Sequence, residues 1–438
     1  MKVLGIKAKA GATLMIGAGA LLFLYSEESF NDGNGSALPT RTLVGGTSCS
    51  SRRGADLGSG GRWEKNPQAG PLMQYGLPWS PVVMGRGTLV KADELHLEGW
   101  ATDPSNHLPS LRSTKYRDPS TYVWRDDPST EEECGPMVPL NGDAFCDTTI
   151  RLGIGKVMFL GDSLSKYHSV ALMNQIRASE GATSMPDNGG YYASHTCSGR
   201  HTVKIVFITN KLLMEKSSPA VPDTMKHTWD PLPWKEEYMS GALSGGGTDS
   251  SLRTLLIVNT GAHHGKFKDY TYVNKAIDDF LSDVKTKFHR PKDIVVLRTT
   301  PPGHPACEKM DHPFENEAER EEFITSLTKD DTPEAQEWKK KLKLYQWDKY
   351  EKMNEHLREA VRMYNKDDSH SGPSNVHLLD VSHMTNLRPD GHMGGIDNKN
   401  PNKKVDCLHY SLPGPIDWWS NLLFANLADL PTHITRLR

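Results

Sequence analysis

The sequence has no excess of charge of either sign. Its 438 residues include 51 lysines and arginines against 54 aspartates and glutamates, so no basic field is present to attract nucleic acid. The most recognisable nucleotide and metal motifs are also absent: there is no GxxxxGKS/T loop, no HExxH and no CxxC pair. We therefore expect no nucleic-acid partner, no bound cofactor and no metal site.

The sequence also lacks an apolar run of the ~20 residues that usually span a bilayer. The uncharged stretch at residues 10–25 is shorter, with three lysines before it and two glutamates after it. This asymmetry places the N-terminus in the cytosol and the rest of the chain in a lumen. Because no small-x-small cleavage site follows, we expect residues 1–26 to form a cytosolic tip and a short signal anchor. A cleaved signal peptide and a secreted protein are the alternative.

Cysteine is scarce, and the six cysteines are far apart: Cys49, Cys134, Cys146, Cys197, Cys307 and Cys407. An even number of dispersed cysteines after a signal segment is typical of disulfides rather than of a zinc site, with buried free thiols as the alternative. Residues 27–60 are polar and rich in glycine and serine, which predicts a flexible luminal stem. The sequon that begins at Asn34 predicts glycosylation there.

Residues 61–438 show no internal repeat and no further break in composition, so we expect one domain. Short runs rich in valine, isoleucine and leucine predict strands buried on both faces, at residues 156–163, 201–210, 253–261, 293–300 and 375–382. Helical patterns separate them, among them residues 270–288 and 334–364. This alternation predicts an α/β fold, a flavodoxin-like three-layer α/β/α sandwich with a mostly parallel central sheet. Ligands of such sheets bind at the carboxyl ends of the strands.

Ser163 stands directly after the first of these strands, where a helix begins. A serine hydroxyl there is within reach of a substrate, and the helix N-terminus favours the negative charge that develops in acyl transfer. The alternative is an ordinary helix N-cap, a role that either Ser163 or Asp162 could fill. A nucleophilic serine needs a base, so the rest of the chain decides between these interpretations.

The strongest base for Ser163 is His409, with Asp406 three residues before it. One short turn could present both side chains, so that His409 takes the serine proton while Asp406 fixes the tautomer of the imidazole. His392, with Asp390 two residues before it, is the competing base. An ordinary ion pair is the alternative for each of these pairs.

Two groups are expected to bind the negative oxygen of an acyl-transfer intermediate. One is the backbone N–H of Ser163, and the other is the side-chain amide of Asn259 at the end of the strand predicted at 253–261. An Asx-turn that caps the strand is the alternative for Asn259.

Six sequence blocks combine into a family pattern. In chain order they are “YVWRDDPSTEEEC”, “FLGDSLSK”, “VNTGAHHG”, “LRTTPPGHPACE”, “RPDGH” and “DCLHYSLPGPIDWW”. Together they resemble the PC-esterase family of the SGNH/GDSL hydrolase superfamily, and most closely the plant trichome-birefringence-like polysaccharide O-acetyltransferases. The resemblance covers residues 62–427, and the order and wide separation of its Gly-Asp-Ser and Asp-Cys-x-His blocks make it specific.

The resemblance implies an SGNH-type catalytic domain with Ser163 as nucleophile, His409 as base and Asp406 as the acid that orients it. Asn259 falls at the oxyanion position. The resemblance also assigns a substrate-binding role to Arg298, Asp390 and His392.

The implied function is O-acetyl transfer to hydroxyls of a polysaccharide or glycan through an acyl-enzyme. The reaction needs an acetyl donor, of which acetyl-CoA is one option. Such an enzyme is expected in the Golgi membrane, as a single-pass type II protein with a luminal catalytic domain. Two alternatives remain: a carbohydrate acetylesterase with the same triad, and a non-catalytic glycan-binding or assembly factor.

Overall fold

The structure, a computed structural model, describes residues 61–66, 82–85, 88–91, 121–137, 139–176, 180–184, 190–198, 201–213, 234–240, 252–263, 270–367, 372–373, 376–392, 406–410, 412 and 414–430. The predicted anchor (1–26), the predicted stem (27–60), Asn34 and Cys49 lie outside these residues. All described residues belong to one unit, Thr47–Arg438. Within the described ranges, no helix combines the length and the apolar character needed to cross a membrane.

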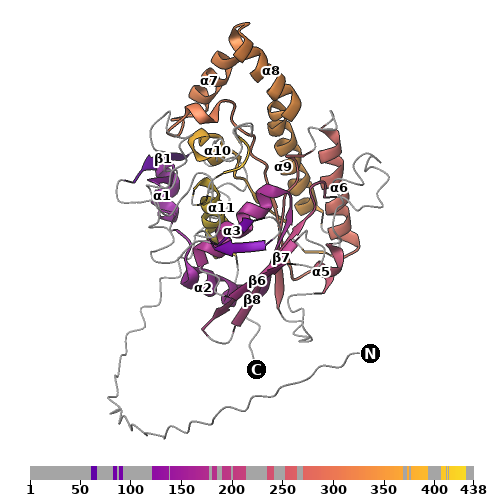
Figure 1. Cartoon of the computed structure of the whole chain (residues 1–438). Coiled ribbons are helices and arrows are strands. Elements are labelled where there is room, and N and C mark those ends of the chain that lie inside the picture. The colour runs from indigo at the N-terminus through magenta and orange to yellow at the C-terminus, as the bar shows by residue number, and fades with distance from the viewer. Residues whose placement is uncertain are drawn as a thin grey trace, which may run out of the picture. The chain divides into compact units, whose positions relative to one another are not determined.

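A seven-stranded sheet with the order β11-β10-β9-β5-β8-β7-β6 forms the centre of this unit (Figure 1). The strands are β5 (Ile154–Gly161), β6 (Glu180–Ser184), β7 (Gly190–Cys197), β8 (His201–Thr209), β9 (Arg253–Val258), β10 (Ile294–Arg298) and β11 (Val376–Leu379). Neighbouring strands from β11 to β8 are parallel, whereas β7 is antiparallel to both of its neighbours. The five strands predicted from the sequence are these five parallel strands, which confirms a mostly parallel sheet.

The alternating side chains of β5 enter two separate hydrophobic cores, one on each face of the sheet. Val157 and Phe159 pack in the core that contains side chains of α2 (Gly142–Leu152), α3 (Ser163–Ile176) and α11 (Pro415–Ala428). Met158 and Leu160 pack in the core that contains side chains of α5 (Lys235–Met239), α6 (Thr271–Thr286) and α9 (Tyr350–Lys366). Helices therefore cover both faces, and the three-layer arrangement follows from the continuous apolar run of the strand.

The remaining elements surround this sandwich. They are β1 (Gly61–Lys65), β2 (Val82–Gly85), β3 (Thr88–Lys91), β4 (Tyr122–Asp126), α1 (Pro128–Cys134), η6 (Cys307–Lys309), α7 (Glu317–Lys329), α8 (Pro333–Tyr345), η7 (Trp347–Lys349), α10 (Ser382–Asn386) and η8 (Pro389–Gly391). The helix expected over 334–364 is divided into α8 and α9, because Gln346 adopts a left-handed backbone with φ 52°. Helices α7 and α8 form a hairpin that extends away from the sheet (Figure 1).

Two disulfides are described in full, Cys146–Cys197 and Cys307–Cys407. The first joins α2 to the end of β7, and the second joins η6 to the segment that contains His409. Cys134 is disulfide-bonded as well. The prediction that the cysteines form disulfides is confirmed for these five residues.

Candidate active site

Ser163 lies at the junction between β5 and α3. β5 ends at Gly161, where an added Cβ would lie 2.5 Å from the Asn259 carbonyl oxygen, so this close approach requires glycine. Asp162 follows, and its carboxylate accepts the Leu164 N–H at 2.9 Å. Asp162 therefore caps the first turn of α3, and the Ser163 hydroxyl is left for another partner.

That partner is His409, which lies 246 residues further along the chain. Its Nε2 is 2.7 Å from Ser163 Oγ, and its Nδ1 is 2.8 Å from Asp406 Oδ2. The other Asp406 oxygen accepts the backbone N–H groups of Leu408 at 3.1 Å and His409 at 3.0 Å. Because the carboxylate can only accept, Nδ1 carries the proton and Nε2 is the nitrogen that can accept one from Ser163.

The contact between Asp406 and His409 shifts the pKa of both groups. Burial raises the pKa of the Asp406 carboxyl, but hydrogen bonds from His409 and from the backbone outweigh burial and hold this pKa well below its ordinary value. Burial lowers the pKa of His409, but the hydrogen bond to Asp406 and its charge raise this pKa above its ordinary value. Asp406 thus stays ionised near neutral pH and stabilises the protonated form of His409.

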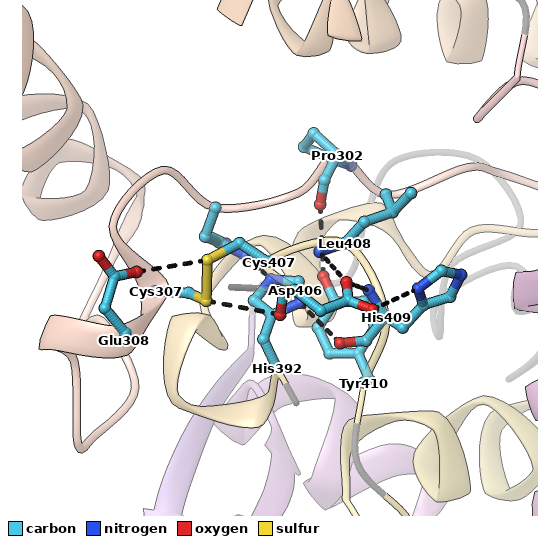
Figure 2. The surroundings of a disulfide bond; sticks show 10 residues. Pro302, Cys307, Glu308, His392, Asp406, Cys407, Leu408, His409 and Tyr410 are labelled. Atoms are coloured by element: carbon cyan, nitrogen blue, oxygen red, sulfur yellow. Dashed lines mark hydrogen bonds and ion pairs between the residues drawn. A yellow bond between two sulfur atoms is a disulfide. The ribbon is translucent and has the colours of Figure 1, made fainter. Parts of the chain in front are cut away.

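The turn that presents His409 is held from several sides (Figure 2). Cys407 is bonded to Cys307, and the Cys407 carbonyl accepts the backbone N–H of His304 at 3.0 Å. The Tyr410 hydroxyl donates to the Pro302 carbonyl at 3.3 Å. The segment after β10 therefore holds residues 406–410 through one disulfide and two hydrogen bonds.

His392, the competing base, serves as part of this support. Its Nε2 lies 2.6 Å from His304 Nδ1, and its Nδ1 lies 3.1 Å from the carbonyl oxygen of His409. Its ring also stacks on Tyr410, with centroids 4.1 Å apart (Figure 2). The structure thus places His409, and not His392, against the Ser163 hydroxyl.

The three residues expected to bind substrate lie in the interior. Arg298 and Asp390 are 1% exposed and His392 is 2% exposed. Asp390 accepts two hydrogen bonds from the Arg388 guanidinium at 2.8 and 2.9 Å. Direct contact between these side chains and a substrate would require the surrounding structure to open.

Arg298 lies beneath α3 rather than in an open site. Its guanidinium is 4.4 Å from the ring centroid of Trp419, and its Nη1 is 3.2 Å from His168 Nδ1. Burial lowers the pKa of Arg298 to about 10, against an opposing effect of the Asp162 charge. The residue therefore packs in the interior beneath the nucleophile.

Asn259 lies beside the end of β5, and its side chain has partners other than Ser163. Its backbone N–H donates to the Leu160 carbonyl at 3.0 Å, which keeps it next to the end of β5. Its side-chain amide donates to Thr300 Oγ1 at 2.5 Å and to the Arg298 carbonyl at 3.3 Å. Since these bonds engage both amide hydrogens, an oxyanion role would need this side chain to turn, and that role stays a prediction.

The sequence interpretation missed the supporting role of His304. This residue is 1% exposed, and its Nε2 donates to the Asn386 carbonyl at 2.6 Å. It joins α10, His392 and Cys407 in one network. The signal available in the sequence was its position six residues after β10, within the “LRTTPPGHPACE” block.

Comparison with known proteins gives both a family match and individual relatives. Residues 250–426 match the PC-Esterase family, described as a GDSL/SGNH-like acyl-esterase family found in Pmr5 and Cas1p. This range includes Asn259, Asp406 and His409. The chain is 26% identical over 293 residues to protein trichome birefringence-like 26 of Arabidopsis thaliana, which covers 60% of each chain.

Two shorter matches show higher identity. Protein trichome birefringence-like 20 of Arabidopsis thaliana is 39% identical over 74 residues, 16% of each chain. Xyloglucan O-acetyltransferase 2 of the same organism is 44% identical over 54 residues, 12% of this chain and 13% of the relative. The chain therefore matches at most 60% of the length of these three relatives. The family match, the relatives and the mostly parallel sheet agree: over residues 250–426 this chain is similar to the PC-esterase family of GDSL/SGNH-like acyl-esterases.

Proposed function

We propose that this protein is a polysaccharide O-acetyltransferase that works through an acetyl-enzyme on Ser163. The observation that carries the proposal is the geometry of Ser163, His409 and Asp406, with contacts of 2.7 and 2.8 Å. The polysaccharide acceptor is supported by relatives named xyloglucan O-acetyltransferase. The Ser-His-Asp arrangement supplies a nucleophile, a base and an orienting acid.

In the first half-reaction, Ser163 Oγ attacks the carbonyl carbon of the acetyl donor while His409 Nε2 takes the hydroxyl proton. The bond between the acetyl carbon and the donor's leaving atom then breaks, and His409 returns the proton to that leaving group. The products are acetyl-Ser163 and the released donor. The Ser163 backbone N–H and the N-terminus of α3 would stabilise the negative oxygen.

In the second half-reaction, a sugar hydroxyl of the acceptor attacks acetyl-Ser163. His409 Nε2 takes the hydroxyl proton, the new ester bond forms, and the bond between the acetyl group and Ser163 Oγ breaks. His409 then returns the proton to Ser163. If water takes the place of the sugar, the same steps make the protein an acetylesterase, which is the second candidate function.

The acetyl-enzyme is the direct test of this proposal. Incubation of the purified full-length protein with an activated acetyl ester should add one acetyl group to the peptide that contains Ser163, as measured by peptide mass spectrometry. Ser163→Ala should abolish the modification. Addition of unacetylated polysaccharide should discharge the acetyl-enzyme faster than water alone and leave acetate esters on the sugar. Discharge at the same rate with and without polysaccharide would favour the esterase instead.

The raised pKa of His409 predicts the pH dependence of the reaction. His409 must be neutral to accept a proton, so kcat/KM should fall as the pH drops through the pKa of His409, at a midpoint above the ordinary ~6.5. Asp406→Asn removes the charge that raises this pKa. The fall of kcat/KM at acidic pH should therefore have its midpoint at a lower pH in this variant, and the maximal rate should drop. An unchanged midpoint in the Asp406→Asn variant would contradict the assignment of this midpoint to His409.

The proposed location is the Golgi membrane, with a single-pass type II topology. The predicted N-terminal anchor and the disulfides support it, because disulfides persist in the lumen of the secretory pathway rather than in the cytosol. Protease digestion of sealed microsomes should leave residues 61–438 intact until detergent is added. Digestion without detergent would contradict this topology.

A further inference from the structure

Two buried histidines, His304 and His392, lie in contact beside the turn that presents His409 (Figure 2). His304 Nδ1 and His392 Nε2 are 2.6 Å apart, and the two residues are 1% and 2% exposed. The other nitrogen of each ring faces a backbone carbonyl. His304 Nε2 lies 2.6 Å from the Asn386 oxygen. His392 Nδ1 lies 3.1 Å from the His409 oxygen, so the pair connects α10 with the turn of the base.

These three contacts need more protons than two neutral histidines possess. A carbonyl oxygen only accepts, so His304 Nε2 and His392 Nδ1 must each carry a proton. A third proton is needed between His304 Nδ1 and His392 Nε2, because two bare nitrogens 2.6 Å apart would place their lone pairs against each other. A neutral imidazole carries one ring proton, and two of them carry two. The pair therefore holds one extra proton and one positive charge.

The surroundings assign this charge to His392 rather than to His304. The ring of His392 stacks on Tyr410 with centroids 4.1 Å apart, and the face of an aromatic ring attracts a cation. Burial, together with the charges of His392 and Arg320, holds the pKa of His304 well below its ordinary value. His304 is therefore the neutral ring that accepts at Nδ1, and His392 donates from both of its nitrogens.

The charged groups around the pair allow a cation at this position. Titratable side chains come from η6, α7, α10, η8 and the turn of the base: Glu308, Glu317, Arg320, His383, Arg388, Asp390, Asp406, His409 and Tyr410. Arg320 contacts Glu317 through Nη1 at 3.3 Å. Arg388 contacts both oxygens of Asp390, at 2.8 and 2.9 Å. Each guanidinium group near the pair thus has a carboxylate beside it, which reduces the repulsion that a further cation meets.

We propose that His392 is an imidazolium in the folded protein and that it positions His409 in this protonated form. Its Nδ1–H donates to the His409 carbonyl, and its Nε2–H donates to His304, which is bound to α10 in turn. Loss of the extra proton would leave one of the three contacts without a hydrogen and weaken the support of the turn. His392 acts through the backbone of His409 and is a positioning residue. The inference goes beyond the proposed function, because this charge does not depend on the reaction catalysed.

The charge of His392 is measured by NMR on the full-length protein labelled with ¹⁵N-histidine. The ring signals of His392 are those that disappear in His392→Asn, or in His392→Gln if urea unfolding shows that the asparagine variant is not folded. We expect both ring nitrogens to carry protons at about pH 7, with a titration midpoint at least about one pH unit above the ordinary ~6.5. One protonated and one bare nitrogen on His392 at this pH would overturn the proposal.

The positioning role is measured by the pH dependence of acetyl transfer. As the pH rises through the midpoint that NMR gives for His392, kcat/KM should fall about tenfold, because the turn loses a charged hydrogen-bond donor. His392→Asn keeps an N–H donor close to the position of Nδ1 but cannot titrate. The alkaline fall should therefore disappear in this variant, while the acidic midpoint set by His409 stays. An alkaline fall that persists unchanged in His392→Asn would overturn the positioning role.

His356→Asn is the matched control, since His356 lies on α9 and contacts Asp278 at 2.9 Å. Both midpoints should stay as in the wild type. An alkaline midpoint that moves in this control would count against its assignment to His392. The NMR measurement needs no acetyl transfer, so the charge of His392 is tested even if Ser163 forms no acetyl-enzyme. A neutral His392 beside an intact acetyl-enzyme would remove this inference and leave the proposed function standing.

Discussion

Replacement of His409 with alanine is expected to reduce acetyl transfer by about 10⁴-fold or more. The reason is that Ser163 Oγ has its proton acceptor at 2.7 Å in this histidine, and an unassisted serine hydroxyl is a weak nucleophile. The measurement is the initial rate of acetyl transfer to polysaccharide, together with a thermal unfolding curve that shows the variant is folded.

A second histidine supplies a matched control for this variant. His356 contacts Asp278 at 2.9 Å on the surface of α9 and α6, which repeats the histidine–aspartate pair away from Ser163. His356→Ala should keep the wild-type rate. His392→Asn should reduce the rate less than His409→Ala, because His392 supports the turn without contacting Ser163. A His409→Ala rate within tenfold of wild type would contradict its assignment as the base.

Removal of the Cys307–Cys407 disulfide is expected to have the second largest effect. The disulfide closes a loop of 100 residues, so the Cys307→Ala/Cys407→Ala variant should lose about 4 kcal/mol of unfolding free energy, as measured in urea. Acetyl transfer should also fall well below wild type at temperatures where the variant is still folded. The added loss arises because Cys407 lies directly beside Asp406, whose carboxylate orients His409.

The second disulfide separates these two effects. Cys146–Cys197 closes a loop of 51 residues between α2 and β7, so its removal should cost a similar free energy. Under folding conditions, however, the Cys146→Ala/Cys197→Ala variant should keep a near-wild-type rate. Equal residual rates in the two disulfide variants would show that the Cys307–Cys407 disulfide acts on stability alone.

The core of the fold could be predicted because its signal is local. The runs that form β5, β8, β9, β10 and β11 are continuous valine-, isoleucine- and leucine-rich segments, as strands buried on both faces require. The two strands at one end of the sheet, β7 and the edge strand β6, were not predicted, since “GYYASHTC” and “EGATS” lack such runs and are held by backbone pairing to a neighbour. The break between α8 and α9 was also missed, because a glutamine in a left-handed conformation has no reliable sequence signal.

Part of the candidate site could also be predicted, from residue types at particular positions rather than from apolar runs. Ser163, Asp406 and His409 were selected by residue type at a strand end and in a short turn, and the structure brings them together. The interior position of His392 could not be predicted, since a polar residue in a loop motif does not reveal whether the loop is buried, whereas Arg298 ends a strand that was predicted to be buried on both faces. The pairing of Asn259 with Thr300 depends on the spacing of β9 and β10, which only the folded sheet defines.

The most direct test of the central claim, that the Ser163 hydroxyl and the His409 imidazole act as one unit, is a double-mutant kinetic cycle. The rates of acetyl transfer are measured for Ser163→Ala, His409→Ala and the variant with both changes. If the serine is useful only when this histidine takes its proton, the double variant should be no slower than the slower single variant. Losses that multiply in the double variant would show that the two side chains act independently, and the mechanism derived from their 2.7 Å contact would be wrong.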